Sequence, residues 1–256
     1  MLTFNEAQLT AWLAPLIWPF LRVLALFTTM PVLGMRSVPA RVKVALALLI
    51  TVAAQPSLPE MPVIALDSGT AVEAVIQQLL IGMALGFAAR IVMAGIEFAG
   101  ELIGLQMGLN FASFFDPISA TQATSVSRFF STSAAWLFVV MNGHLLLTAA
   151  VIQSFHAFPV ASPDAAPLAF LAQVQPQAWG TEVFRLGLWI ALPIVTMLLF
   201  MNLVLGVIAR VASQMNIFAI GFPITLGVGL IGITLTLPLM EQPFTAALER
   251  LLAQFQ

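Results

Sequence analysis

The residues whose types and spacing most clearly suggest a function lie in one short segment, GLNFASFFDP at Gly108–Pro117. The segment stands between two long apolar runs and contains three aromatic rings, a carboxylate and a proline: Phe111, Phe114, Phe115, Asp116 and Pro117. The rings would be costly to expose to water, and the carboxylate would be costly to place in lipid. A segment that lines or blocks a narrow pore reconciles the two, because packed rings can exclude water from a constriction. A re-entrant loop packed in the protein interior explains the composition equally well.

The other reactive side chains form no catalytic or metal-binding pattern. His144 and His156 have no second pair of ligands beside them, whereas a metal site needs such a cluster. The chain has no cysteine, no Ser/His/Asp arrangement at a defensible spacing and no glycine-rich phosphate loop. We therefore expect a protein that is not an enzyme and that holds no cofactor and no metal.

Charged residues at membrane depth are the next candidates. Arg22 and Arg90 stand within or at the end of apolar runs, where an unpaired charge is expensive. Glu97 and Glu101 are one helical turn apart, so they share a face. These charges could belong to an ion path, but the commoner arrangement is an arginine that snorkels or pairs with a nearby glutamate. We predict buried charge pairs among Arg90, Glu97 and Glu101.

The composition requires an apolar environment for the elements that carry these residues. Of the 256 residues, 61% are hydrophobic and only 8% are charged, whereas a soluble domain carries roughly 25% charged residues. Too few polar residues remain to cover a globular surface, so the surroundings must be lipid or other apolar proteins. The net charge of -2 and the lack of a basic cluster argue against nucleic acid as a partner.

The apolar runs predict an all-α membrane protein with about six long, partly broken hydrophobic helices. The predicted runs are Ala7–Met30, Val42–Ala54, Ala71–Ile96, Phe129–Phe155, Leu186–Ala209 and Ile217–Met240. The prolines that interrupt them are Pro15, Pro19, Pro193, Pro223 and Pro238. An amphipathic piece, Phe244–Phe255, follows the last run. No hydrophilic stretch is long enough for a separate soluble domain, so residues 1–256 are expected to form a single integral membrane domain.

Glycine spacing indicates close helix packing. Gly82 and Gly86 form one four-residue step, and Gly100, Gly104 and Gly108 form two more. Small residues at this spacing let helix backbones approach one another within lipid. The partner helix can belong to the same chain or to another subunit, and the spacing does not distinguish the two.

Interrupted helices at membrane depth suit a transporter, a channel or a pore built from several subunits. Backbone groups freed by proline and glycine are tolerated where protein or a water-filled cavity takes them up. An independent ion-coupled secondary transporter is one interpretation, although no inverted repeat is recognisable. Because the sequence shows no nucleotide site, the energy for any transport must come from elsewhere.

Several spaced motifs resemble one known family over nearly the whole chain. They are GLNFASFFDP, NGH at Asn142–His144, SFHAFP at Ser154–Pro159, QMNIFAIGFPITLGVGL at Gln214–Leu230 and MPVLGMRSVPARVKVALAL at Met30–Leu48. Together they are similar to the FliR family, the flagellar branch of the type III secretion export gate (FliR/SctT-like proteins). Injectisome relatives share much of this architecture, and the motifs favour the flagellar branch.

This resemblance implies a function. Members of the family form, with FliP and FliQ, a pore through which unfolded flagellar proteins are secreted, and they are required for flagellum assembly. FlhB and FlhA-like export proteins are further implied partners, beside membrane lipid. The implied location is the bacterial inner membrane at the flagellar basal body. The implied fold is a set of helix hairpins that complete a helical pore assembly, so that apolar faces could be buried against sister subunits.

The resemblance also implies a role for the first segment. The family has a loop between its middle helices that acts as a plug, and this loop matches Gly108–Pro117. On that basis the residues expected to obstruct the resting channel are Phe111, Phe114, Phe115, Asp116 and Pro117. FliP supplies a further constriction in the family, so the plug need not be the only seal.

Overall fold

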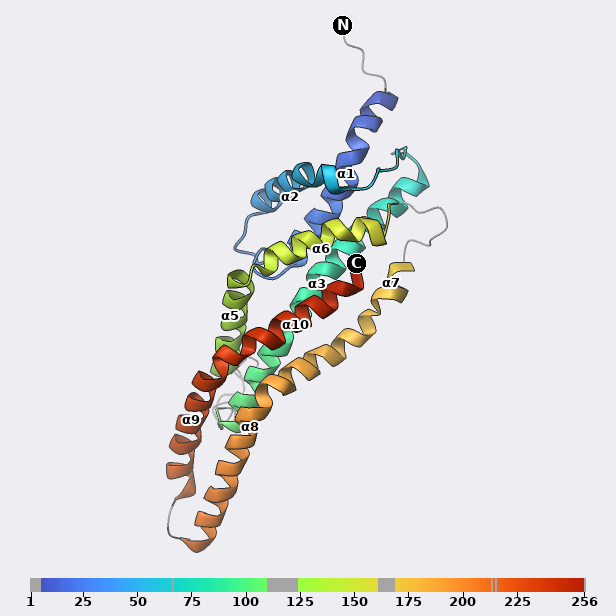
Figure 1. The fold of residues 1–256 in the computed structure, drawn as a ribbon. Coiled ribbons are helices and arrows are strands. Elements are labelled where there is room, and N and C mark those ends of the chain that lie inside the picture. Colours follow the sequence, from blue (N-terminus) through green and yellow to red (C-terminus); the bar gives the residue numbers. More distant parts are fainter. Residues whose placement is uncertain are drawn as a thin grey trace. The chain divides into compact units, whose positions relative to one another are not determined.

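The fold is described from a computed structural model, which places residues 6–65, 67–109, 124–160, 169–212, 214 and 216–255. Within these ranges every regular element is a helix. The α-helices are α1 (Glu6–Thr29), α2 (Ala40–Ala54), α3 (Gly69–Gln106), α5 (Ser125–Val140), α6 (Gly143–Ala157), α7 (Ala169–Val174), α8 (Trp179–Val211), α9 (Ile217–Thr236) and α10 (Glu241–Leu252) (Figure 1). Short 3-10 turns are η1 (Gln55–Ser57), η2 (Pro176–Ala178), η3 (Leu237–Met240) and η4 (Ala253–Phe255). The predicted all-α fold class is confirmed.

Four regions of the described chain are long and apolar enough to cross a membrane. They are Ala40–Ser57, Gly69–Gln106, Phe170–Val211 and Ala219–Phe255. The pair α5 and α6, bent by 64°, would make a fifth. The bend follows from Asn142, whose φ of 55° lies in the left-handed region and so stops the regular helix. The predicted number of about six is therefore approximate.

Two features of the predicted helices differ from the structure. Helix α3 has 38 residues and continues through Glu97 and Glu101, beyond the predicted end at Ile96. Glutamate favours helix well, so the loss of apolarity there ended the predicted membrane run without ending the helix. The prolines also interrupt less than predicted, since helices α1, α8 and α9 continue through theirs. Pro238, the last of the five prolines in the predicted runs, lies just after the end of α9, in η3.

The chain divides into two compact units. Unit 1 comprises Met1–Arg90, Phe138–Trp179 and Leu248–Gln256. Unit 2 comprises Ile91–Leu137 and Gly180–Ala247. Helix α3 thus contributes its first half to unit 1 and its second half to unit 2.

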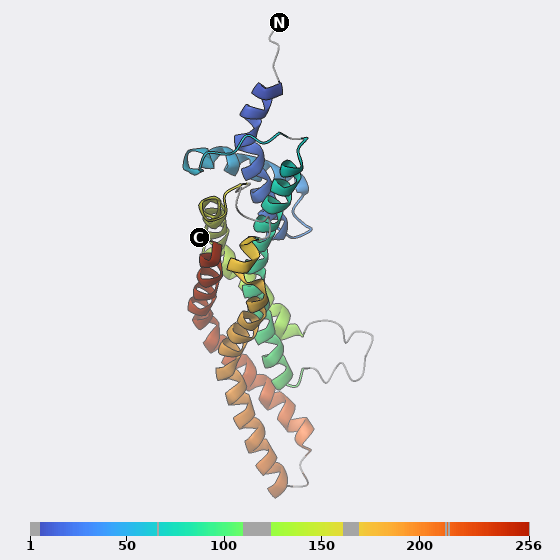
Figure 2. The same ribbon diagram turned by 90° about the vertical axis from the view of Figure 1, so that its right-hand side faces the viewer.

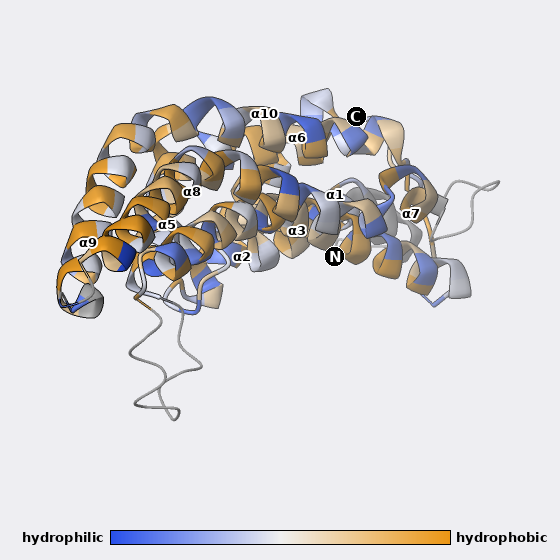
Figure 3. Ribbon diagram, turned by 90° about the horizontal axis from the view of Figure 1, so that it is seen from below, coloured by the Kyte–Doolittle hydropathy of each residue, from blue (hydrophilic) through white to orange (hydrophobic). Residues whose placement is uncertain are grey.

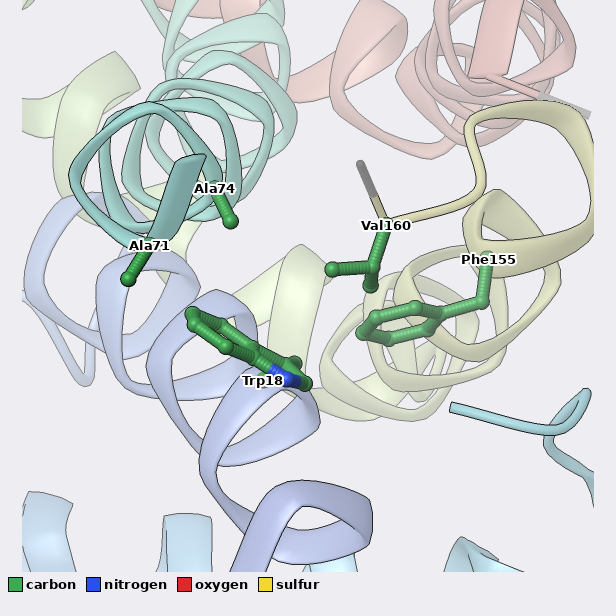
Figure 4. Packing of buried hydrophobic residues seen from close by; sticks show 5 residues of the cluster. All are labelled: Trp18, Ala71, Ala74, Phe155 and Val160. Atoms are coloured by element: carbon green, nitrogen blue, oxygen red, sulfur yellow. The ribbon is translucent and has the colours of Figure 1, made fainter. Parts of the chain in front are cut away.

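The core of unit 1 is built around one tryptophan. Figure 4 shows the Trp18 indole pointing from α1 into the space between α3 and the end of α6. On α3 it meets two small residues, Ala71 and Ala74, and on the other side it meets Phe155 and Val160. The alanines leave room for the large ring, so burial of Trp18 fixes the spacing of α1, α3 and α6.

Unit 2 is dominated by two long apolar helices that run side by side. Figures 1 and 2 both show α8 and α9 as an antiparallel hairpin. A Cβ atom added to Gly232 of α9 would lie 2.8 Å from the Met197 side chain of α8, so the two helices approach closely. Both helices are hydrophobic over most of their surface (Figure 3). Trp189 and Leu203 on α8 and Leu235 on α9 are each about two-thirds exposed, so these faces require apolar surroundings.

Candidate functional site

The predicted plug residues lie outside the described part of the chain. Description stops at Leu109 and resumes at Thr124, so it excludes Phe111, Phe114, Phe115, Asp116 and Pro117. The candidate site is therefore built from the two ends that hold this segment. We call it the segment frame, and it consists of Glu101, Gly104, Met107, Gly108, Thr124 and Ser127.

The first end of the frame is a sharp helix stop. Gly108 has a φ of 79°, a left-handed conformation that costs glycine little. The backbone N–H of Leu109 donates to the Gly104 carbonyl at 3.1 Å, and that of Gly108 donates to the Leu105 carbonyl at 3.1 Å. This pair of bonds is the Schellman motif, which satisfies the last carbonyls of a helix. Gly108 thus ends α3, a role that the four-residue glycine spacing did not predict.

The second end of the frame is a helix start. Thr124 caps α5, because its Oγ1 accepts a hydrogen bond from the Ser127 backbone N–H at 3.1 Å. The Thr124 N–H in turn donates to Oε1 of Glu101 at 3.2 Å. In a capping box, the acceptor for the backbone N–H of the cap residue is the side chain of the third residue of the same helix. Here that acceptor is Glu101, which belongs to another helix, α3. Its negative charge also interacts favourably with the positive end of the α5 dipole.

Two glycines allow the helices of the frame to meet. A Cβ atom added to Gly100 would lie 2.7 Å from the Ser127 Cα, and one added to Gly104 would lie 2.7 Å from the Thr124 Oγ1. Ser127 Oγ also donates to the Glu97 carbonyl at 3.2 Å. The start of α5 is therefore fixed against the end of α3, so both ends of the undescribed segment are anchored at one place.

Helix α9 covers the first end of the frame. Met107 is fully buried, and a Cβ atom added to Gly229 would lie 2.6 Å from its Cγ. Thr225 Oγ1 donates to the Gly221 carbonyl at 3.1 Å and lies 3.5 Å from the Met107 carbonyl. Both Thr225 and Gly229 belong to the stretch Gln214–Leu230, so this glycine-rich stretch packs against the residue that precedes the Gly108 stop.

A second polar site lies in unit 1 around Arg22, which is fully buried. Its Nε donates to Gln78 Oε1 at 2.8 Å, and its two Nη atoms donate to Ser154 Oγ at 2.9 Å and to the Phe158 carbonyl at 2.8 Å. The guanidinium carbon also lies 3.7 Å from the centre of the Phe155 ring, which is a cation–π contact. Among the described residues no carboxylate pairs with Arg22. Its partners are neutral acceptors and a ring, which the sequence did not indicate.

The other predicted packing glycines, Gly82 and Gly86, pack against α1, the helix that carries this arginine. A Cβ atom added to Gly82 would collide with the Arg22 carbonyl and lie 2.8 Å from the Ala25 Cβ. One added to Gly86 would lie 2.7 Å from the Met30 backbone nitrogen. The sequence left open whether these glycines face the same chain or another subunit, and in the structure both face α1.

The predicted charge pairs among Arg90, Glu97 and Glu101 remain a prediction. The Arg90 side chain is exposed, and Glu97 and Glu101 are half-buried. Within the described ranges, no group of three or more His, Asp or Glu residues could hold a metal ion. The carboxylate of Glu101 accepts the hydrogen bond from the Thr124 backbone N–H in the segment frame.

The apolar surface and the candidate spans define the class of this protein, a helical membrane protein. Residues 13–251 match the family described as "Bacterial export proteins, family 1", and the chain belongs to this family. It is 44% identical to the flagellar biosynthetic protein FliR of Pectobacterium carotovorum subsp. carotovorum, over 95% of this chain and 92% of the relative. The same values hold for FliR of Escherichia coli strain K12. FliR of Bacillus subtilis strain 168 is 28% identical over 83% of this chain and 82% of the relative.

These matches confirm the resemblance found in the sequence. The chain belongs to a family of flagellar export proteins, which is not an enzyme family, and its apolar helices agree with a membrane location. Its partners are accordingly expected within the export apparatus.

Proposed function

We propose that this protein is a subunit of the flagellar type III protein export gate. With FliP and FliQ it forms the pore through which unfolded flagellar proteins are secreted, and it is required for flagellum assembly. The observation that carries the proposal is the 44% identity to flagellar biosynthetic proteins over 95% of the chain. The whole chain acts as one integral membrane domain in the bacterial inner membrane, at the flagellar basal body. FlhB and FlhA-like proteins are further partners.

The exposed apolar faces of α8 and α9 support an assembly of several chains. Phe200 and Leu203 are exposed at 65% and 66%, and no charged residue lies between Arg185 and Arg210. Lipid or a neighbouring subunit must cover such a surface, because it is too apolar to face water. A ring of sister subunits covers one part and lipid covers the rest.

A secretion assay tests the proposal. A strain that lacks the gene for this chain is expected to release no flagellar subunits into the medium, and a plasmid copy of the chain is expected to restore release. Secretion that continues at the normal level without the chain would contradict the proposal. An independent ion-coupled transporter would instead take up a substrate when the chain alone is placed in liposomes with an ion gradient.

We propose further that the residues between the two anchored ends plug the resting channel, through Phe111, Phe114, Phe115, Asp116 and Pro117. Support comes from the frame, which fixes Leu109 and Thr124 against the same part of α3. In the test, residues 111–117 are replaced by glycine and serine at equal length, which leaves Gly108 and the Thr124 cap intact. Small-ion leakage through the assembled complex is expected to rise. Unchanged leakage in a complex that still assembles would exclude the plug.

A further inference from the structure

Helix α2 and the connector before it carry three basic residues close together in the sequence. Arg36, Arg41 and Lys43 stand within eight residues, and no Asp or Glu occurs between residues 7 and 59. Arg36 and Arg41 are exposed, and the half-buried Lys43 donates to the Met35 carbonyl at 3.4 Å. None of the three has a carboxylate partner in the described part of the chain. These cations are therefore available to an external anion.

The same helix exposes an apolar face. The residues that α2 buries share one side of the helix: Ala47, Thr51 and Ala54. On the opposite side, Leu48, Leu49 and Val52 are exposed at 51%, 66% and 55%. No polar side chain interrupts this exposed face after Lys43. The helix thus presents cations at its start and hydrocarbon along the rest of its free side.

The stretch Ala40–Ser57 is apolar and long enough to be a candidate span, but the regular helix within it, α2, is short for a full crossing. Its 15 residues span about 22 Å at about 1.5 Å per residue, whereas the hydrocarbon core of a bilayer is about 30 Å thick. Figures 1 and 2 both show α2 lying across α1 in unit 1, not alongside it. The side chain of Gln55, just after α2, donates from Nε2 to the Pro15 carbonyl of α1 at 3.1 Å and holds this crossing.

We propose that α2 is an anchor that lies against one leaflet of a membrane containing anionic phospholipid. Arg36, Arg41 and Lys43 bind the phosphate groups, while the exposed leucine and valine side chains enter the acyl chains. Charge complementarity favours lipid over a protein partner with an apolar surface, which would cover the leucines and leave three cations unmatched. The inference concerns a lipid site and does not depend on the proposed export gate.

A headgroup-binding assay tests the cations. Binding of fluorescent phosphatidylglycerol and phosphatidylcholine to the full-length chain in detergent is compared for two variants. The variant R36Q/R41Q/K43Q is expected to lose phosphatidylglycerol affinity on the order of 100-fold, about fivefold per cation, with phosphatidylcholine binding unchanged. The variant R36K/R41K/K43R keeps the three charges and is expected to keep the affinity. Equal affinity of both variants for phosphatidylglycerol would overturn the proposal.

A depth measurement tests the apolar face without altering the charges. The chain has no cysteine, so single cysteines at Leu49 and Met35 can each carry a nitroxide in phosphatidylglycerol vesicles. The Leu49→Cys label is expected to be accessible to oxygen, and the Met35→Cys label to a water-soluble nickel chelate. A Leu49→Cys label that the nickel chelate reaches would contradict the anchor. A label shielded from both reagents in the assembled complex would show that a subunit covers α2, which also overturns the proposal.

Discussion

The two halves of α3 use the same glycine spacing and support it with opposite kinds of polar group. In unit 1, Gly82 and Gly86 let α1 approach, and the junction holds a buried cation, Arg22, among neutral acceptors. In unit 2, Gly100 and Gly104 let α5 approach, and the anion Glu101 stands at the start of that helix. Four-residue glycine steps thus allow two helices to come into contact at both places. The polar group beside the glycines, Arg22 or Glu101, determines which further bonds hold each contact.

The difference between the two polar groups lies in burial. Arg22 is fully buried and fixes three backbone or side-chain oxygens, so unit 1 depends on it as a rigid junction. Glu101 is half-buried and makes a single described bond, to a backbone N–H. We therefore expect substitutions at the first junction to cost more stability than substitutions at the second.

The largest effect is expected from Arg22→Met. The change leaves Gln78 Oε1, Ser154 Oγ and the Phe158 carbonyl without their donor in a buried place, and each orphaned group costs roughly 1–3 kcal/mol. We expect the free energy of unfolding to fall by about 3–5 kcal/mol, allowing for partial rearrangement. Titration of the purified protein with denaturing detergent, followed by circular dichroism, measures this change. The control is Arg210→Met, at an exposed position. Equal stability of the two variants would show that Arg22 does not stabilise unit 1.

A smaller loss is expected from Gly86→Ala. The added Cβ would lie 2.7 Å from the Met30 backbone nitrogen, which cannot move aside as a flexible side chain can. We expect a loss of about 1–3 kcal/mol in unfolding free energy, the usual cost of overpacking. Gly206→Ala is the matched control, since its Cβ meets nothing within 4 Å, and it should leave stability unchanged or raise it by up to about 1 kcal/mol. The reverse order would mean that α1 and α3 are not in close contact.

Gly108→Ala tests the helix stop in unit 2. A residue with a Cβ atom loses roughly 1–2 kcal/mol in the left-handed conformation that Gly108 adopts, and Gly108→Asn should lose less because asparagine tolerates it better. The measurement is again unfolding of the purified chain. Gly227→Ala is the control in the same unit, because nothing lies within 4 Å of its added Cβ. Equal stability of the Gly108→Ala and Gly108→Asn variants would argue against a left-handed conformation at the end of α3.

The smallest effects are expected at the α5 start. Thr124→Ala removes the acceptor for the Ser127 N–H and should cost about 0.5–2 kcal/mol. Glu101→Gln keeps an acceptor for the Thr124 N–H and loses only the charge, worth about 0.3–1 kcal/mol beside a helix start. Unfolding of both variants is compared with that of Glu249→Gln, an exposed control. A Glu101→Gln loss larger than that of Thr124→Ala would point to an ion pair of Glu101, as the sequence predicted.

The sequence predicted the helices well because apolar runs of this length have few alternatives in a chain so poor in charge. It predicted helix ends less well, because membrane apolarity and helix formation are different properties: α3 continues through Glu97 and Glu101, and α8 continues through Pro193. The left-handed conformation of Gly108 was not predicted, because its four-residue spacing from Gly104 also fits a glycine that packs between helices.

The partners of the polar groups could not be predicted from local pattern. Arg22 meets Gln78, 56 residues away, and Ser154, 132 residues away. Glu101 accepts a hydrogen bond from the cap residue of α5, Thr124, which lies 23 residues later. Such contacts depend on how the helices pack, which a single sequence does not contain. The motifs did identify the family, because they are spaced over nearly the whole chain.

The most direct test of the central claim is the subunit composition of the native complex, purified through a tag on this chain and weighed by native mass spectrometry. We predict a single assembly that contains this chain together with FliP-like and FliQ-like proteins. These partners help to cover the apolar faces of α8 and α9. Recovery of the chain as a functional monomer, without either partner, would contradict it.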